Sequence, residues 1–305
     1  MIHAGILAAL AGQPWALDAA AFDVMAGVIQ RWASGQMLSQ EQIRIAIAGA
    51  PDAMAARRES AAQSSAGGVA VIPVFGTIAH RAHMVNQVSG PGGTSTEKLG
   101  AAIDAAANSN DVAAIVLDVD SPGGAVAGTP ELVDRIYAAR QSKPIVAVAN
   151  ATAASAAYWI ASAASEFIVT PSGSVGSIGV LGVHEDRSAG LAAEGKKLTF
   201  IHAGKYKVEG NSAEPLSDEA RATIQAMVDQ AYGVMVRSIA RNRGVSPDAV
   251  RSQYGEGRMF SAEDAMSRGM VDRVATLEET IARMGNPRRR SRLAAANNAV
   301  RIAAL

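Results

Sequence analysis

The spacing of apolar positions divides the chain into two parts, which differ in the periodicity of their apolar residues. In the first part, residues 17–32 repeat apolar side chains at helical spacing, and Ser39 with Gln42 forms a capping box ahead of a second apolar stretch. A stretch rich in Ala, Ser, Arg and Gly begins at residue 55 and is typical of a linker. The pattern therefore predicts a helical appendage with its linker over residues 1–66.

After the linker, short apolar runs alternate with helical patterns. The runs typical of strands are 69–75, 113–119, 145–149, 167–170 and 198–202. The helical patterns are 94–108 with its capping box of Thr94 and Glu97, 129–141, a small-residue helix from 154, 218–242, and two short helices starting at Ser246 and Ser261. This alternation predicts an α/β domain with a mainly parallel sheet over residues 67–284. The basic, Asn-rich stretch 285–305 is predicted to be a disordered tail.

The amino-acid composition excludes several classes of partner and of catalytic site. The 305 residues carry a formal net charge of zero, which gives no reason to expect nucleic acid as a partner. The absence of cysteine excludes disulfides, thiol catalysis and thiolate metal sites. His80 and His83 could share a helix face, but no acids cluster near them in the sequence, so we interpret them as surface residues. We expect neither a metal nor another cofactor.

One uncharged segment, residues 145–165, is long enough to cross a membrane. It contains an asparagine, a threonine and several serines, and it opens with a strand-like pattern. These features favour a buried strand, a turn and a small-residue helix over a transmembrane helix. The first residues also lack the basic stretch of a secretory signal. We therefore expect no membrane span.

Two predicted strand ends carry residues that could do chemistry, because functional groups gather at the carboxyl ends of parallel strands. After the run 113–119 comes Gly123–Gly124, whose backbone N–H groups can approach a developing negative charge. After the run 145–149 comes Ser155, at a strand-to-helix turn with small neighbours. Each feature also has an ordinary interpretation, as a simple turn and as a helix cap.

A nucleophilic serine needs a base. None of the five histidines stands at a recognisable spacing from an aspartate. Lys205 and Lys207 lie in a loop after the run 198–202, and lysine can act as a base when burial favours its neutral amine. Both could equally be solvated loop charges.

Four motifs in this order resemble the signal peptide peptidase A superfamily: Asp-Ser-Pro-Gly-Gly at 120–124, Ala-Ala-Ser-Ala-Ala-Tyr at 153–158, Gly-Ser-Ile-Gly-Val at 176–180 and Gly-Lys-Tyr-Lys at 204–207. The resemblance covers about residues 68–284. It implies a ββα spiral like that of Clp protease and crotonase, and a homo-oligomer. It also implies a Ser–Lys dyad of Ser155 and Lys207, formed within or between subunits, with the backbone N–H groups of Gly124 and Ala156 as oxyanion donors.

Within that superfamily, stretches such as 117–128 and 207–211 are similar to phage head-maturation proteases. This similarity implies a serine endopeptidase that cleaves scaffold, capsid or portal proteins in the prohead, within the bacterial cytoplasm. Some such proteases continue into a scaffold-forming extension, whereas this sequence stops at Leu305. Three alternatives stay open: a peptidase of remnant signal peptides, a crotonase-like acyl-CoA enzyme, and a non-catalytic capsid component.

Overall fold

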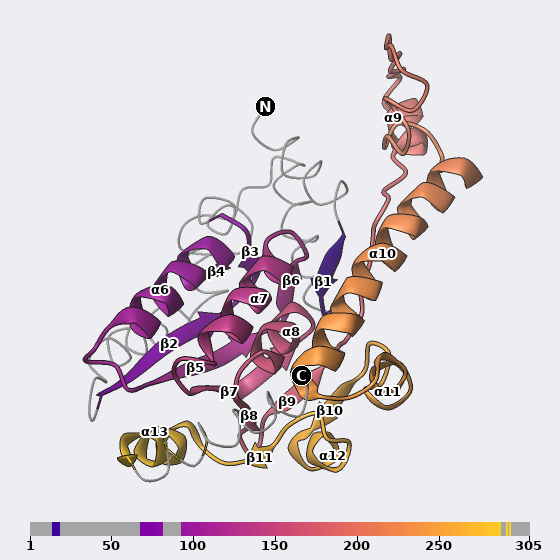
Figure 1. Cartoon of the computed structure of the whole chain (residues 1–305). Coiled ribbons are helices and arrows are strands. Elements are labelled where there is room, and N and C mark those ends of the chain that lie inside the picture. Colours follow the sequence, from indigo (N-terminus) through magenta and orange to yellow (C-terminus); the bar gives the residue numbers. More distant parts are fainter. Residues whose placement is uncertain (1–13, 19–67, 82–92, 288–290, 292, 294–305) are drawn as a thin grey trace, which may run out of the picture.

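The computed structural model describes residues 14–18, 68–81, 93–287, 291 and 293 (Figure 1). Its strands are β1 (Trp15–Leu17), β2 (Val69–Phe75), β3 (Ile78–Ala79), β4 (Thr94–Ser95), β5 (Ala114–Ser121), β6 (Gly123–Ala125), β7 (Ile145–Ala154), β8 (Glu166–Val169), β9 (Ser174–Gly176), β10 (Met259–Ser261) and β11 (Arg273–Val274). Its helices are α6 (Thr96–Asn108), α7 (Thr129–Ala139), α8 (Ala156–Ser162), α9 (Ser188–Ala193), α10 (Asp218–Arg243), α11 (Pro247–Gln253), α12 (Ala262–Ser267) and α13 (Leu277–Gly285).

The larger sheet has seven strands and is parallel except at one edge. The order β10-β9-β7-β5-β2 forms its main path, β8 also pairs with β7, and β11 pairs with β8. Only the pairing of β9 with β10 is antiparallel. The helix α6 lies in the chain between β2 and β5, α7 between β5 and β7, and α8 between β7 and β8, as crossover connections require. The predicted α/β class with a mainly parallel sheet is confirmed.

Both faces of this sheet are covered, which explains the long apolar runs of its central strands β5 and β7. Alternate residues of β5 point to opposite faces. Ile115, Leu117 and Val119 belong to the larger core cluster, together with residues of α6, α7, α8 and α10. Ala114 and Val116 belong to a smaller cluster, which Met284 of α13 joins from the other side. Figure 1 shows α6, α7 and α8 side by side over one face.

A second, four-stranded sheet has the order β1-β6-β3-β4. Its strand β6 leaves the end of β5 directly, so the smaller sheet begins at the carboxyl edge of the larger one. β1 runs antiparallel to β6, whereas β3 runs parallel to β6 and to β4. The small sheet thereby brings a segment from the start of the chain to the edge where chemistry was predicted.

The uncharged segment 145–165 is the buried strand β7, a turn and the buried helix α8, as the sequence predicted. Within the described residues, we find no helix with the length and apolar character needed to cross a membrane.

Two predicted helix starts are shifted by one residue. Ser95, not Thr94, caps α6, because its side chain accepts from the backbone N–H of Lys98. The Thr94 hydroxyl is held elsewhere: it accepts from the Phe75 N–H and donates to the Phe75 carbonyl, both at 2.9 Å. The helix α7 follows Gly128, whose φ of 82° starts the helix without a side-chain cap at Thr129.

The prediction of a strand at 198–202 is wrong. This stretch lies in a projecting segment of residues 181–217, here called the arm, which runs beside the outer part of α10 and carries α9 near its tip (Figure 1). Its two limbs are joined where the Arg187 N–H donates to the Ser212 carbonyl at 2.8 Å. The apolar side chains that suggested a strand are exposed instead: Leu198 is 55% and Ile201 99% exposed.

The terminal regions fall mostly outside the described residues, including nearly all of the predicted helix at 17–32 and the capping box at Ser39. The described part of the region predicted as a helical appendage, Trp15–Leu17, is a strand. Near the other end, where a disordered tail was predicted, Leu293 packs against the smaller core cluster.

Candidate active site

Ser155 stands between the end of β7 and the start of α8, in a backbone conformation that few serines adopt. Its φ is 54° and its ψ is −115°, close to the first central position of a type II′ turn, which glycine normally occupies. The residue is fully buried. Its N–H donates to the Gly176 carbonyl at 2.7 Å, and its hydroxyl donates to the Gly179 carbonyl at 3.3 Å. A strained serine at a strand-to-helix turn is typical of a nucleophile.

The Gly123–Gly124 turn lies directly against this serine. A Cβ placed on Gly123 would come within 3.0 Å of the Ser155 Cβ, and one on Gly124 within 1.9 Å of the Ile78 carbonyl oxygen. Both positions therefore require glycine. The Ser121 hydroxyl donates to the Gly76 carbonyl at 2.6 Å and accepts from the Gly123 N–H at 3.2 Å, which holds the turn in place.

The strand pairing explains why these two motifs meet. β5 and β7 are parallel neighbours that pair as far as Ser121 and Ala153, with a shift of register between Val119 and Ser121, so their carboxyl ends lie at one edge. The glycine turn continues from one end, and the nucleophile turn continues from the other. Ala156 opens α8 immediately after Ser155 and is fully buried. The structure thus brings together three of the four predicted site residues: Ser155, Gly124 and Ala156.

Lys207 is placed differently. It is exposed and lies in the arm, where its N–H donates to the Gly204 carbonyl at 3.1 Å. Among the described residues, no hydrogen bond or ion pair joins its amine to Ser155, whose hydroxyl bonds to Gly179. A single copy of the chain therefore does not bring the two members of the expected dyad together.

Lys205 is bound to its neighbours. Its amine lies 2.7 Å from the Tyr206 hydroxyl and 3.2 Å from the Glu219 carboxylate. These hydrogen bonds, the one to Tyr206 first, raise the pKa of Lys205 above its ordinary value, so its amine stays protonated. A base must be neutral before it can take a proton, which makes Lys205 the less suitable of the two lysines.

A further part of the site was not predicted. The strand β1 lies between β6 and Leu181 of the arm, pairing antiparallel with both. Trp15, Ala16 and Leu17 are all buried there. A three-residue strand is too short to show a period, and its partners lie more than a hundred positions away, so no local signal could have found it.

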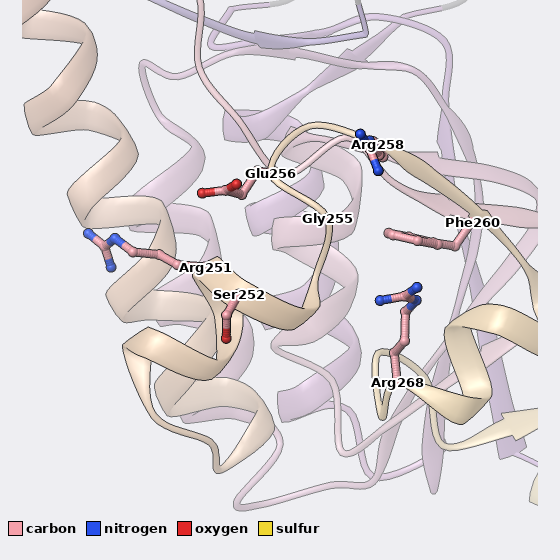
Figure 2. A pocket seen from close by; sticks show the side chains of 7 residues that line it. All are labelled: Arg251, Ser252, Gly255, Glu256, Arg258, Phe260 and Arg268. Atoms are coloured by element: carbon pink, nitrogen blue, oxygen red, sulfur yellow. The ribbon is translucent and has the colours of Figure 1, made fainter.

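A pocket of about 310 Å³ is formed mainly by the end of α11, β10 and the loop that joins them. Figure 2 shows its lining, Arg251, Ser252, Gly255, Glu256, Arg258, Phe260 and Arg268, with the Arg268 guanidinium below the Phe260 ring. The Arg258 carbonyl accepts from the Ser177 N–H at 2.8 Å. The wall of this pocket thus supports the 176–179 backbone that holds Ser155, while none of its side chains is a predicted site residue.

No group of three or more His, Asp or Glu side chains within the described ranges is arranged to hold a metal ion. His80, which the sequence analysis placed on the surface, is exposed, and its Nδ1 lies 3.1 Å from the Thr96 hydroxyl. His83 lies outside the described residues.

Residues 137–289 match the model of peptidase family S49. This match spans half of the chain and includes Ser155 and the arm, so the chain belongs to that family.

Its relatives include two phage proteins. The chain is 36% identical over 217 residues to the head-tail preconnector protein GP5 of Enterobacteria phage P21, which is 71% of this chain and 42% of that protein. It is 34% identical over 228 residues to the capsid assembly protease C of Escherichia phage lambda, covering 74% and 51%. The chain therefore spans about half the length of these relatives.

Cellular relatives match as well. Protease 4 of Salmonella typhi is 30% identical over 182 residues, or 56% of this chain and 28% of that protein. Among solved structures, a ClpP1 mutant from Listeria monocytogenes aligns with a TM-score of 0.43 and 15% identity, over 69% of this chain and 94% of that one.

Proposed function

We propose that this protein is a serine endopeptidase in which Ser155 is the nucleophile and Lys207 the general base. The observation that carries the proposal is the strained, buried Ser155 lying against the Gly123–Gly124 turn. Membership of peptidase family S49 supports the same reaction class. The arrangement fits a nucleophile beside backbone donors, as peptide hydrolysis needs.

In the proposed reaction, the neutral Lys207 amine takes the Ser155 proton as the hydroxyl oxygen attacks a peptide carbonyl. The N–H groups of Gly124 and Ala156 stabilise the resulting oxyanion, and one such donor is worth about 10²–10³ in rate. Protonated Lys207 then gives its proton to the leaving amine, and the C–N bond breaks. Water, activated by the same amine, hydrolyses the acyl-enzyme ester and restores Ser155.

Lys207 is proposed to reach the Ser155 of a neighbouring copy. Two observations support this arrangement: the exposed place of Lys207 on the arm, and the apolar side chains exposed beside it at Leu198, Phe200 and Ile201. Apolar groups gathered on a projecting segment favour association with another surface. Burial at such a contact would also favour the neutral form of a lysine.

The proposed substrates are the scaffold, capsid or portal proteins of a phage head, cleaved during its maturation. Support comes from the names of two relatives, a capsid assembly protease and a head-tail preconnector protein. The runner-up is a peptidase of remnant signal peptides, which the more distant similarity to a putative signal peptide peptidase of Enterococcus faecium supports.

The test is co-expression of the chain with phage scaffold and capsid proteins, followed by mass spectrometry of the products. We expect the wild-type chain to cleave them, and also Lys205→Ala, a matched control two residues from Lys207. Ser155→Ala and Lys207→Ala should leave them whole. Cleavage retained by either of these two variants would refute the dyad.

The same experiment addresses the two alternatives from other classes. A crotonase-like acyl-CoA enzyme would not need Ser155 or Lys207, and a non-catalytic capsid component would tolerate the loss of both. If the wild-type chain leaves every co-expressed protein whole while heads still assemble, the peptidase proposal is wrong.

A further inference from the structure

The strand β1 sits at the nucleophile like a bound peptide. On one side, Trp15 and Leu181 exchange both of their backbone hydrogen bonds, each at 2.9 Å. On the other side, the Asp18 N–H donates to the Pro122 carbonyl at 2.9 Å. The segment 14–18 is thus an extended strand that forms backbone hydrogen bonds on both of its sides. Proteins that bind peptides by strand addition use the same backbone hydrogen bonds.

The register places one peptide bond of this segment over the catalytic groups. Ala16 lies opposite Gly124 and Leu17 opposite Gly123. A Cβ on Gly123 would lie 2.3 Å from the Ala16 carbonyl oxygen and 3.0 Å from the Ser155 Cβ. The Ala16 carbonyl is therefore beside both the glycine turn and the nucleophile.

The ladder itself directs that carbonyl toward Gly124. Hydrogen bonds join Asp18 to Pro122, and Val126 to Pro14 at 3.4 Å, on either side of the Ala16–Gly124 pair. Hydrogen-bonded pairs alternate along an antiparallel ladder. Ala16 and Gly124, midway between the two bonds, consequently occupy a hydrogen-bonding position, where the carbonyl of one faces the N–H of the other. This N–H is the proposed oxyanion donor.

The side chains also fit a bound substrate. Ala16 is fully buried within the larger core cluster, which leaves room there only for a small side chain. Its neighbours Trp15 and Leu17 are 3% and 4% exposed. A competing peptide would need the same two backbone pairing partners, β6 and Leu181, so it could not bind while β1 is in place.

We propose that residues 14–18 are a built-in substrate of this peptidase, cleaved between Ala16 and Leu17. The inference rests on the proposed function. The Ser155 oxygen bonds to the Ala16 carbonyl carbon, the bond to the Leu17 nitrogen breaks, and that nitrogen takes the proton removed from Ser155. Water then hydrolyses the ester, releasing residues 1–16 with a carboxylate end. Until this cleavage, the segment keeps other substrates from pairing with β6 and Leu181.

The experiment is the intact mass and N-terminal sequence of the purified full chain over time. We expect wild-type protein to acquire an N-terminus at Leu17 and Ser155→Ala to stay whole. Ala16→Arg should slow the cleavage at least tenfold, because a long charged side chain cannot occupy a fully buried alanine position. The matched control Ala105→Arg, at an exposed position of helix α6 away from the arm, should be cleaved like wild type.

A second measurement does not depend on how Ala16→Arg folds. The substrate is a fluorogenic peptide with the sequence of residues 12–20. The processed wild-type chain should cleave this peptide after the alanine that corresponds to Ala16. It should not cleave the same peptide with arginine at that position. The inference is wrong, and the peptidase assignment stands, if wild-type protein cleaves capsid or scaffold proteins while its own peptide bond between residues 16 and 17 stays whole. Cleavage of the chain at another bond within residues 14–18 would lead to the same conclusion. If it cleaves neither itself, the peptide nor those proteins, the peptidase assignment fails.

Discussion

Replacing the nucleophile by glycine should give a more stable protein than replacing it by alanine, and both changes should abolish activity. Ser155 holds φ at 54° and ψ at −115°, a region in which a side chain is unfavourable and glycine is not. The variant Ser155→Gly removes the Cβ that causes the strain. Ser155→Ala is the matched comparison, because alanine keeps the Cβ and loses the same hydroxyl.

The magnitude follows from two opposing terms. A residue held in such a conformation costs about 1–3 kcal/mol. Glycine removes this cost, but it loses more conformational entropy on folding than alanine, which lowers the stability by about 0.5–1 kcal/mol. Both variants lose the 3.3 Å hydrogen bond from the Ser155 hydroxyl to the Gly179 carbonyl, so that loss cancels in the comparison. Ser155→Gly should therefore exceed Ser155→Ala by about 1 kcal/mol, or about 2 °C in Tm for a chain of this size.

Urea titration and thermal unfolding of the two variants measure this difference directly. Glu256→Gly serves as a reference, because Glu256 also has a positive φ, 46°, on an exposed loop outside the site. If Ser155→Gly were no more stable than Ser155→Ala while Glu256→Gly gained stability, the serine turn would not be strained. Ser155 would then lack the strained backbone that distinguishes it as a nucleophile.

Three other perturbations have definite expected outcomes. Burial raises the pKa of Tyr158 far above its usual value, so the folded protein keeps a proton that the unfolded chain loses above about pH 10, and stability should fall there. Tyr158→Phe should make this loss of stability with pH smaller in urea titrations at pH 9–11, but should not abolish it, because the raised pKa of Tyr254 contributes to the same loss. At neutral pH the variant should be about 1 kcal/mol less stable, because the Met270 carbonyl loses its donor at 2.8 Å. Leu198→Glu with Ile201→Glu should weaken the proposed oligomer, measured by light scattering, and change the unfolding free energy by less than about 0.5 kcal/mol, since both side chains are exposed in one copy. Light scattering that is the same for this variant and wild type would exclude the arm as a contact. Glu166→Gln should cost about 2 kcal/mol in urea titrations, because Arg283, only 17% exposed, loses its carboxylate partner at 2.6 Å; an unchanged midpoint would mean that this ion pair adds no net stability.

The serine and glycine turns could be predicted from the sequence because their signals are local. An apolar strand followed by small residues fixes where Ser155 lies, and parallel pairing of β5 with β7 then brings it to the Gly123–Gly124 turn. The backbone conformation of Ser155 could not be predicted, since it depends on the bond from its N–H to the Gly176 carbonyl.

Other parts depend on partners that a local pattern does not reveal. The run 198–202 alternates like a strand, but a strand forms only where another strand pairs with it, and this run lies in the exposed arm. Conversely, Trp15–Leu17 becomes a strand because β6 and Leu181 supply partners on both sides. The place of Lys207 is a third such case, because its proposed contact lies on another copy of the chain.

The most direct test of the account combines two inactive variants. Ser155→Ala and Lys207→Ala chains, carrying different affinity tags, are co-expressed and purified in sequence so that only mixed oligomers remain, and peptide cleavage is measured beside each variant alone. The account predicts that the mixed oligomers cleave, since a Lys207 from one variant can serve the Ser155 of the other, while each variant alone does not. Mixed oligomers as inactive as the separate variants, or activity in either variant alone, would contradict it.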